Sequence, residues 1–206
     1  LAKRGIVASV AHSSGNYDTA YESLNHGFSD ITHVYNACTS CYKEGVFRRA
    51  GTVEAALSDD RFSVQAISDL VHLPVGVLRL IYKAKGSDKM YLITDGLEFS
   101  AFDMNEGEEF TQKNGVKVVY EDEVMKLADR SCLAGSTANG ARLVRNMYKT
   151  VGVPLTEAVK MMTLTPARVI GVDSYKGKIA EGYDADIILF DENVEVSSVM
   201  INGKLA

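Results

Sequence analysis

The sequence has 206 residues, of which 46% are hydrophobic and 24% are charged. This length and balance predict a folded domain with a substantial core rather than a disordered chain. The formal net charge of −5 argues against a general surface for nucleic acid or membranes, and no apolar run approaches the ~20 residues of a membrane-spanning helix. Three cysteines without framework spacing fit a reducing cytoplasm.

The start of the chain has no initiator methionine. Leu1–Arg4 lead directly into an apolar run at residues 6–11 that is typical of a buried strand. We therefore expect the sequence to be a piece of a longer protein.

Apolar runs rich in valine and isoleucine alternate with segments of helical spacing over the first hundred residues. The runs predict strands at 6–11, 31–35, 63–67 and 90–94, and the segments between them predict helices at 17–24, 53–57 and 75–83. In the last helix, Pro74 suits the first turn and Leu78 and Ile81 share a face. Strand–helix alternation of this kind predicts a parallel α/β sheet or barrel.

The pattern changes after about residue 107. Residues 109–112 and 116–120 flank Asn114-Gly115, which is a strong hairpin signal, and 124–127 is a further candidate strand. Ala134-Gly135-Ser136 is expected to be a turn before three helices, the second opened by Pro154. The tail from 176 predicts strands at 185–190 and 196–201 and a last short strand. We expect a partial barrel at 1–175, with a hairpin excursion at about 107–128, and a β-strand tail at 176–206.

Four predicted strands end on groups that can bind metal or move a proton: His12, His33, His72 and Asp95. His12 and His33 are one strand–helix unit apart, which places them on adjacent strands at the same rim. Two neutral imidazoles suit a divalent metal such as zinc, and a carboxylate at the same rim can act as a general acid and base. A single histidine is more often structural, as we expect of His26, but four aligned strand ends favour a site.

Three other signals have plainer interpretations. Cys38-Thr39-Ser40-Cys41 has the spacing of a redox pair, but no second pair accompanies it, so coincidence is favoured. Gly135-Ser136-Thr137 is either an anion-binding nest or an N-cap turn, and the sequence does not separate the two. The basic residues between 83 and 89 are expected to form a solvated helix end.

The strand-end motifs resemble the N-acetylglucosamine-6-phosphate deacetylases of the amidohydrolase superfamily, and the resemblance runs the length of the chain. Its most specific block is Thr32-His33-Val34-Tyr35-Asn36-Ala37, and Leu92-Ile93-Thr94-Asp95 resembles the strand that carries the family's catalytic aspartate. Further matching motifs are Ala11-His12-Ser13, Tyr17-Asp18, Gly27-Phe28, Leu133-Ala134-Gly135-Ser136, Arg145-Asn146, Thr163-Leu164-Thr165-Pro166-Ala167-Arg168, Gly177-Lys178-Ile179, Gly182, Ala185-Asp186 and Asn202-Gly203. The last four, in the tail, identify only the superfamily.

The resemblance implies the C-terminal half of a TIM (β/α)8 barrel of the metal-dependent hydrolase type, plus strands of a small β-sandwich domain. It implies removal of the N-acetyl group of N-acetylglucosamine 6-phosphate, giving glucosamine 6-phosphate and acetate, in an intact enzyme that is a homodimer. It assigns metal binding to His12 and His33, with zinc expected and iron or another divalent ion as alternatives, and general acid–base catalysis to Asp95. It assigns substrate binding to Asn36, Ala37, Arg48, His72, Gly135 and Ser136.

The sequence also departs from the family pattern. Leu70 stands where the family has glycine, and Arg48-Arg49-Ala50 replaces Arg-Glu-Pro, although Arg48 keeps the position that reaches the phosphate across a dimer interface. The family's glutamate metal ligand comes from the N-terminal half of the barrel, so this chain is expected to be incomplete for catalysis. Two alternatives stay open: another amidase of the superfamily, and a non-catalytic fragment that binds a sugar phosphate.

Overall fold

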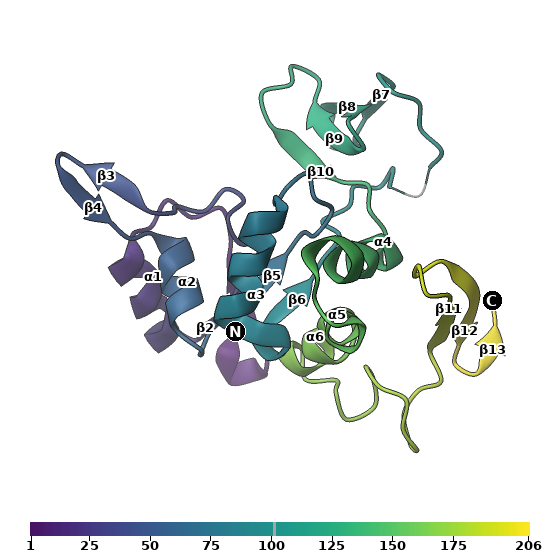
Figure 1. The fold of residues 1–206 in the computed structure, drawn as a ribbon. Coiled ribbons are helices and arrows are strands. Elements are labelled where there is room, and N and C mark those ends of the chain that lie inside the picture. The colour runs from purple at the N-terminus through teal and green to yellow at the C-terminus, as the bar shows by residue number, and fades with distance from the viewer. Residues whose placement is uncertain (101) are drawn as a thin grey trace.

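The computed structural model describes residues 1–100 and 102–206 (Figure 1). Its strands are β1 Ala8–Val10, β2 Phe28–Ile31, β3 Tyr42–Glu44, β4 Phe47–Arg49, β5 Ser63–Ala66, β6 Met90–Leu92, β7 Glu109–Thr111, β8 Lys117–Glu121, β9 Val124–Leu127, β10 Leu133–Ser136, β11 Ile187–Phe190, β12 Val196–Ile201 and β13 Lys204–Leu205. Its helices are η1 Ala2–Arg4, α1 Tyr17–Ser23, η2 Leu24–His26, α2 Thr52–Ser58, α3 Val75–Lys89, α4 Gly140–Arg145, η3 Asn146–Val151, α5 Leu155–Met162 and α6 Leu164–Val169.

A parallel sheet of order β1-β2-β5-β6 forms the centre of the molecule. The connections between its strands contain α1, α2 and α3, so the predicted strand–helix alternation is confirmed. The carboxyl ends of parallel strands meet at one edge of a sheet. The topology therefore brings the segments that follow β1, β2, β5 and β6 together at that edge.

The hydrophobic core lies between this sheet and the helices α3, η3 and α5. Leu78 and Ile81 of α3 are fully buried against it, as their shared helical face predicts. The helix runs further than the predicted residue 83, to Lys89, although the backbone leaves helical geometry at Gly86, where φ is 58°. The largest fully buried side chains are Phe62, Ile31, Ile67, Leu73, Leu78, Ile81, Met90, Met125, Leu143, Met147, Met161 and Val34.

The other face of the sheet carries a polar layer with one residue from each parallel strand. The buried Asp30 carboxylate accepts hydrogen bonds from Ser9 Oγ at 2.7 Å, Gln65 Nε2 at 2.6 Å and Tyr91 OH at 3.1 Å. Burial raises the pKa of Asp30, and these hydrogen bonds partly oppose the rise. Ser9 Oγ also lies 2.6 Å from Thr32 Oγ1. The layer therefore ties the ends of β1 and β2 together just below His12 and His33.

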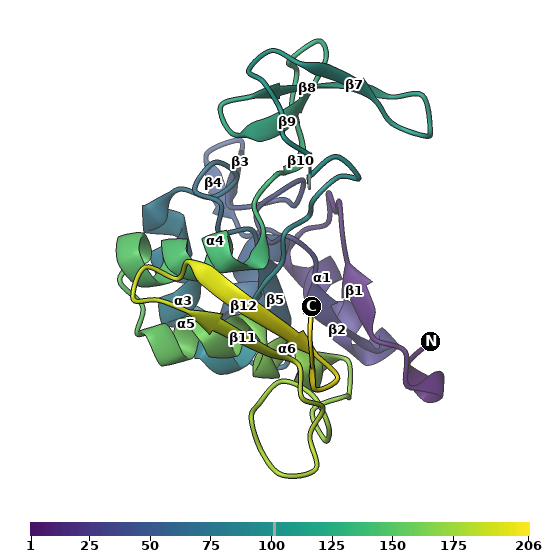
Figure 2. The ribbon, with the colours of Figure 1, turned by 90° about the vertical axis from the view of Figure 1, so that its right-hand side faces the viewer.

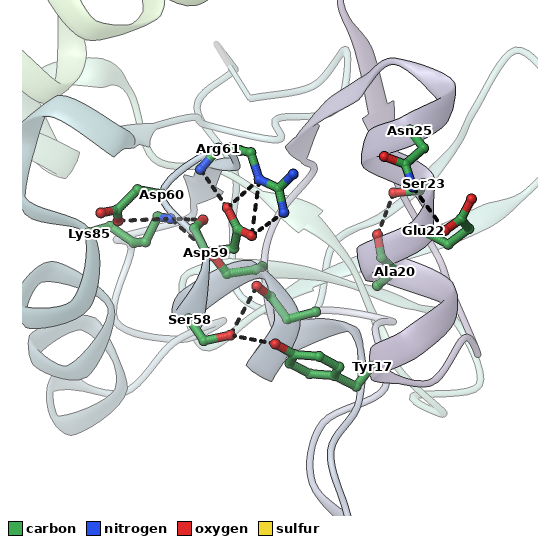
Figure 3. Close-up of polar contacts among 12 residues, drawn as sticks. Tyr17, Ala20, Glu22, Ser23, Asn25, Ser58, Asp59, Asp60, Arg61 and Lys85 are labelled. Carbon is green, nitrogen blue, oxygen red and sulfur yellow. Dashed lines mark hydrogen bonds and ion pairs between the residues drawn. The ribbon is translucent and has the colours of Figure 1, made fainter.

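The Lys85 side chain is buried, which corrects the expectation of a solvated basic helix end, and Figure 3 shows it pointing toward Asp59 and Asp60. Lys85 Nζ donates to the carbonyl oxygens of Ala56 at 3.1 Å and Asp59 at 2.7 Å. These are carbonyls at the C-terminal end of α2, where a cation also meets the negative end of the helix dipole. Burial lowers the pKa of Lys85, so the two carbonyls offset a real desolvation cost.

The predicted strand at 31–35 is wrong in its position. The strand is Phe28–Ile31, and the chain turns immediately after it. His33, Tyr35 and Ala37 all have positive φ, which no strand permits. The main chain is held in this turn because Thr32 N donates to Val10 O and Val34 N donates to Gln65 O. Tertiary contacts thus override the β propensity of this segment.

The excursion after β6 is a four-stranded antiparallel sheet of order β10-β9-β8-β7, which stands apart from the helices in both views (Figures 1 and 2). The predicted hairpin is confirmed, with Gly115 at φ 87° in the turn between β7 and β8. The expected turn at residues 134–136 is wrong, since these residues lie in β10 and pair with β9. A bulge between Leu133 and Gly135 accommodates the glycine within the strand.

Two further antiparallel elements complete the fold. The tail strands β11, β12 and β13 form a three-stranded sheet beside α4, α5 and α6, as Figure 2 shows, at nearly the predicted positions. The hairpin β3–β4, which the sequence did not predict, projects from the body as an exposed arm (Figure 1). In the part of the chain that is described, no helix is long and apolar enough to cross a membrane.

Candidate functional site

Unusual backbone conformations gather at the carboxyl edge of the parallel sheet. His12, His33, Leu70 and Asp95 follow β1, β2, β5 and β6, and their φ angles are 46°, 31°, 73° and 49°. A residue other than glycine in this left-handed region costs on the order of 1–3 kcal/mol, and such residues concentrate at functional sites. Leu70 occupies the position where the resembling family has glycine, and its φ explains that preference.

The imidazole rings of His12 and His33 lie edge to face just after the ends of β1 and β2. Their ring centroids are 4.8 Å apart with an angle of 64° between the ring planes. His33 is buried, and its Nδ1 has no hydrogen-bond partner among the described residues. A buried ring nitrogen without a partner is costly unless another group binds it. The pair therefore fits two of the ligands of a divalent metal ion.

No complete metal site forms within residues 1–100 and 102–206. No group of three or more histidine, cysteine, aspartate or glutamate side chains there is arranged to hold an ion. Within these residues the structure thus supplies two converging imidazoles.

Asp69 and His72 form a buried pair beyond β5. Asp69 Oδ2 lies 2.6 Å from His72 Nδ1, and Asp69 Oδ1 accepts hydrogen bonds from the backbone N–H groups of Val71 at 3.0 Å and His72 at 2.9 Å. Burial alone would raise the pKa of Asp69, but the hydrogen bonds from His72 and from the Ser136 side chain hold it below its usual value. An ionised Asp69 fixes the ring of His72 with Nδ1 as donor, which leaves Nε2 for another partner.

Gly135 and Ser136 contact the segment that carries Asp95. Ser136 N donates to Asp95 O at 3.1 Å, and Gly96 forms an isolated parallel bridge with Ser136. A Cβ on Gly135 would lie 2.9 Å from Asp95 O, so only glycine permits this close approach. The N-cap alternative for this segment is wrong, because Asn139 caps α4 by accepting from Arg142 N at 2.9 Å.

The loop that carries Asn36 and Ala37 is tied to the loop after His12. Ser13 O accepts hydrogen bonds from Thr39 N at 2.9 Å and from Thr39 Oγ1 at 3.2 Å. Ala37 is exposed with φ 50°, and the Asn36 amide lies 3.5 Å from Val34 O, at the limit of a hydrogen bond. The side-chain amide of Asn36 is therefore only weakly engaged, and both residues lie within four residues of His33 in the chain.

Arg48 lies on the exposed arm rather than among the strand ends. In the described residues its side chain makes no hydrogen bond or ion pair, whereas Arg49 Nε donates to Glu44 Oε2 at 2.8 Å. His26, the expected structural histidine, lies at the surface on η2, with Nε2 3.7 Å from Glu22 Oε1.

The structure thus brings together the predicted residues His12, His33 and Asn36 on one side of the edge and Asp95, Gly135 and Ser136 on the other.

Two features of the site escaped the sequence interpretation. The role of Asp69 in orienting His72 could have been read from their spacing of three residues after a strand. The only sequence signal of the arm is the glycine of its turn, Gly45, because its short strands consist mostly of charged residues.

Comparison with known proteins confirms the resemblance read from the motifs. The sequence pattern of the Amidohydrolase family matches residues 73–206. The N-acetylglucosamine-6-phosphate deacetylase of Haemophilus influenzae is 34% identical over 202 residues, which are 98% of this chain and 51% of that protein. A putative N-acetylgalactosamine-6-phosphate deacetylase of Escherichia coli K12 is 33% identical over 174 residues, which are 84% of this chain and 98% of that protein.

The solved structures give the same picture. The crystal structure of N-acetylglucosamine-6-phosphate deacetylase from Pasteurella multocida superposes with a TM-score of 0.90 at 30% identity, covering all of this chain and 52% of that one. The chain thus spans about half the length of the full-length deacetylases from Haemophilus influenzae and Pasteurella multocida, and nearly all of the shorter relative from Escherichia coli.

Proposed function

The chain belongs to the amidohydrolase family and folds as half of a TIM (β/α)8 barrel, and from this premise we propose that its strand-end site hydrolyses the N-acetyl group of N-acetylglucosamine 6-phosphate. The products are glucosamine 6-phosphate and acetate. The observation that carries the proposal is the convergence of His12 and His33 at the carboxyl edge of the parallel sheet, where the buried Nδ1 of His33 has no partner among the described residues.

His12 and His33 are the metal ligands in this proposal. A divalent ion, zinc in the first instance, would supply activation of water and polarisation of the acetamide carbonyl. A metal ion bound at Nδ1 would offset the cost of burying this nitrogen of His33, which has no partner among the described residues. The polar layer of Asp30, Ser9 and Thr32 holds the two strand ends in register below the ligands.

Asp95 is the general base and acid. It is exposed at the edge of the sheet, and its main chain is clamped by Ser136 N and by the close approach of Gly135. It accepts a proton from the attacking water and delivers it to the departing amine. His72, oriented by Asp69, binds the substrate through Nε2.

The phosphate is bound by the amide groups of Asn36 and Ala37 together with Arg48. Arg48 lies on an arm that extends away from the parallel sheet of the same chain (Figure 1). This placement fits a site that is completed by the arm of a second subunit in a homodimer. A planar guanidinium can bind a phosphate through two parallel hydrogen bonds.

A cytoplasmic location is part of the proposal, since Cys38, Cys41 and Cys132 are all free thiols.

The epimer of the sugar is the main competitor, because the relative of nearly matching length is named for N-acetylgalactosamine 6-phosphate. Another N-acyl substrate and a non-catalytic sugar-phosphate-binding role are the remaining alternatives. The epimers differ only at one hydroxyl, so a test of both substrates under one set of conditions separates them.

The decisive experiment measures acetate release from both sugar phosphates, with zinc, by the chain alone and by the chain fused to the upstream half of the Haemophilus influenzae relative. His33→Ala and Asp95→Ala must each abolish release, whereas His26→Ala, which removes an exposed imidazole, must leave it unchanged. Isothermal titration must show zinc binding that His12→Ala and His33→Ala weaken. Absence of both zinc binding and acetate release in the fused protein would sink the catalytic assignment and leave the fold.

A further inference from the structure

The arm β3–β4 has two chemically different faces. The register pairs Tyr42 with Arg49, Lys43 with Arg48, and Glu44 with Phe47. Directly paired residues point to the same side of a hairpin, and neighbours along a strand point to opposite sides. One face therefore carries Lys43 and Arg48, and the other carries Tyr42, Glu44, Phe47 and Arg49.

The contacts within the arm agree with this division. Arg49 Nε donates to Glu44 Oε2 at 2.8 Å, and the Arg49 guanidinium lies 5.7 Å from the centroid of the Phe47 ring. The only acidic side chain of the arm is thus engaged on the face opposite Lys43 and Arg48. Across the described residues, neither Lys43 nor Arg48 takes part in an ion pair or a hydrogen bond through its side chain.

Two cations opposite each other on a hairpin repel. The Cβ atoms of directly paired residues lie roughly 4.5–5.5 Å apart, and like charges at such a pair are destabilising. An exposed hairpin of two three-residue strands has little else to offset that repulsion. The pair is explained if an anion binds between the two side chains.

We propose that Lys43 and Arg48 together form the phosphate-binding face of the arm, so that Lys43 is a second cationic ligand of the substrate's phosphate monoester. This inference rests on the proposed function, in which Arg48 is the one cation of the arm that binds the phosphate. The guanidinium of Arg48 supplies a planar pair of donors, and the ammonium of Lys43 adds a compact charge from the neighbouring strand. Both contacts are charge-assisted hydrogen bonds to a dianion.

The base of the arm is held firmly enough to aim this face. Glu54 Oε1 accepts hydrogen bonds from Ser40 Oγ at 2.9 Å and Cys41 N at 3.0 Å, and Oε2 accepts from Gly51 N at 2.7 Å. The chain entering the arm and the chain leaving it are thereby joined through one carboxylate. A Cβ on Gly51 would lie 2.3 Å from Thr39 O, which shows how closely the two ends meet.

The test measures binding of glucosamine 6-phosphate and of glucosamine by isothermal titration with the full chain and zinc, at fixed ionic strength. Lys43→Gln and Arg48→Gln are each expected to weaken binding of the phosphorylated sugar by roughly tenfold, without changing binding of glucosamine. Lys43→Arg restores most of the loss. Arg49→Gln is the matched control, because it removes a charge from the same arm on the other face.

A second readout follows the arm itself. Titration with inorganic phosphate should shift the backbone amide resonances of Lys43 and Arg48, and the double variant K43Q/R48Q should abolish the shifts. If Arg48→Gln weakens binding while Lys43→Gln matches Arg49→Gln, the inference is wrong and the proposed role of Arg48 stands. If the chain binds the phosphorylated sugar no better than glucosamine, the phosphate assignment of the proposed function fails, and this inference fails with it.

Discussion

The parallel sheet and the tail sheet contain similar apolar strands but bury them very differently. In β2, β5 and β6 the apolar residues that face the helices are almost fully covered, and Ile31 has an exposed fraction of 0%. In the tail sheet Leu189 of β11 is 59% exposed and Ile201 of β12 is 54% exposed. Apolar runs therefore predicted strands in both regions, but they did not predict how differently the two sheets would be covered.

The difference in burial between the two sheets determines which of them can hold a functional site. Strained turns after β1, β2, β5 and β6 persist because the covered sheet and its hydrogen bonds over-determine the backbone around them. All predicted metal, acid–base and sugar-binding residues except Arg48 follow those strands or contact the segments after them. None lies in the tail sheet, whose strands β11 and β12 leave apolar side chains exposed on the surface.

The largest expected effect tests the contrast in burial directly. Ile31→Ala should lower the free energy of unfolding by about 2–5 kcal/mol, because it removes a fully buried side chain and leaves a cavity. Leu189→Ala, its matched control in the tail sheet, should cost less than about 1 kcal/mol, since much of its side chain already contacts water. Urea unfolding of the two variants measures both values. Equal losses would mean that the tail sheet is as tightly packed as the parallel sheet.

The next largest effect compares a closely packed glycine beside the parallel sheet, Gly135, with an open one in the tail sheet, Gly203. Gly135→Ala places a Cβ 2.9 Å from Asp95 O and 3.0 Å from Leu97 Cγ, at φ 143°, and should destabilise the fold by about 1–3 kcal/mol. In the protein fused to the upstream half it should also reduce acetate release, because the Asp95 backbone must move. Gly203→Ala in the tail turn, whose nearest neighbour is 3.9 Å away, should cost only the backbone strain of about 1–2 kcal/mol. Thermal unfolding and acetate release separate the two; a Gly135→Ala variant with full activity would contradict the clamp on Asp95.

The sequence was a better guide to the strand ends than to the strands. His12 and His33 were placed on adjacent strands because the connection between them is one strand–helix unit, and the parallel pairing of β1 with β2 confirms it. The strand at 31–35 was misplaced, since its β-branched and aromatic residues carry no sign of the hydrogen bonds that turn the chain there. The burial of Lys85 was also invisible, because it depends on carbonyls nearly thirty residues earlier.

A smaller effect is expected at the base of the arm. Glu54→Gln keeps the shape of the side chain but removes the charge that accepts from Ser40, Cys41 and Gly51, so stability should fall by about 1–2 kcal/mol. Burial alone would raise the pKa of Glu54, but these hydrogen bonds hold it below its usual value. The difference between wild type and variant should therefore persist at neutral pH and shrink as the solution is acidified below about pH 4.5.

Amide hydrogen exchange across residues 40–51 is the measurement that locates this effect, and Glu22→Gln, on the surface of α1, is its control. Faster exchange confined to the arm and its base is expected for Glu54→Gln. Faster exchange spread evenly over the parallel sheet would instead assign Glu54 to the general stability of α2.

The smallest effect is expected for Asp59 and Arg61, an ion pair that lies after α2 and away from the carboxyl edge of the parallel sheet. Asp59 accepts hydrogen bonds from Arg61 Nη2 at 2.6 Å and from Arg61 N at 2.9 Å (Figure 3), and Arg61 lowers the pKa of Asp59 from 3.8 to about 2. A carboxyl with a depressed pKa adds stability above its unfolded pKa and loses that stability as the pH falls through its folded pKa. The guanidinium is half exposed, so the contribution should be no more than about 1 kcal/mol.

Urea unfolding of wild type and Asp59→Asn at several pH values measures this contribution. The gap in stability should be constant above pH ~4 and close between pH ~4 and ~2. Acetate release by the fused protein at neutral pH should not change, because the Asp59 carboxylate accepts its hydrogen bonds from Arg61, beyond the end of α2. A gap that stays constant down to pH 2 would show that the aspartate acts by its shape and not its charge. A loss of activity would show that the carboxyl edge is coupled to the end of α2, which the hydrogen bonds of Asp59 give no reason to expect.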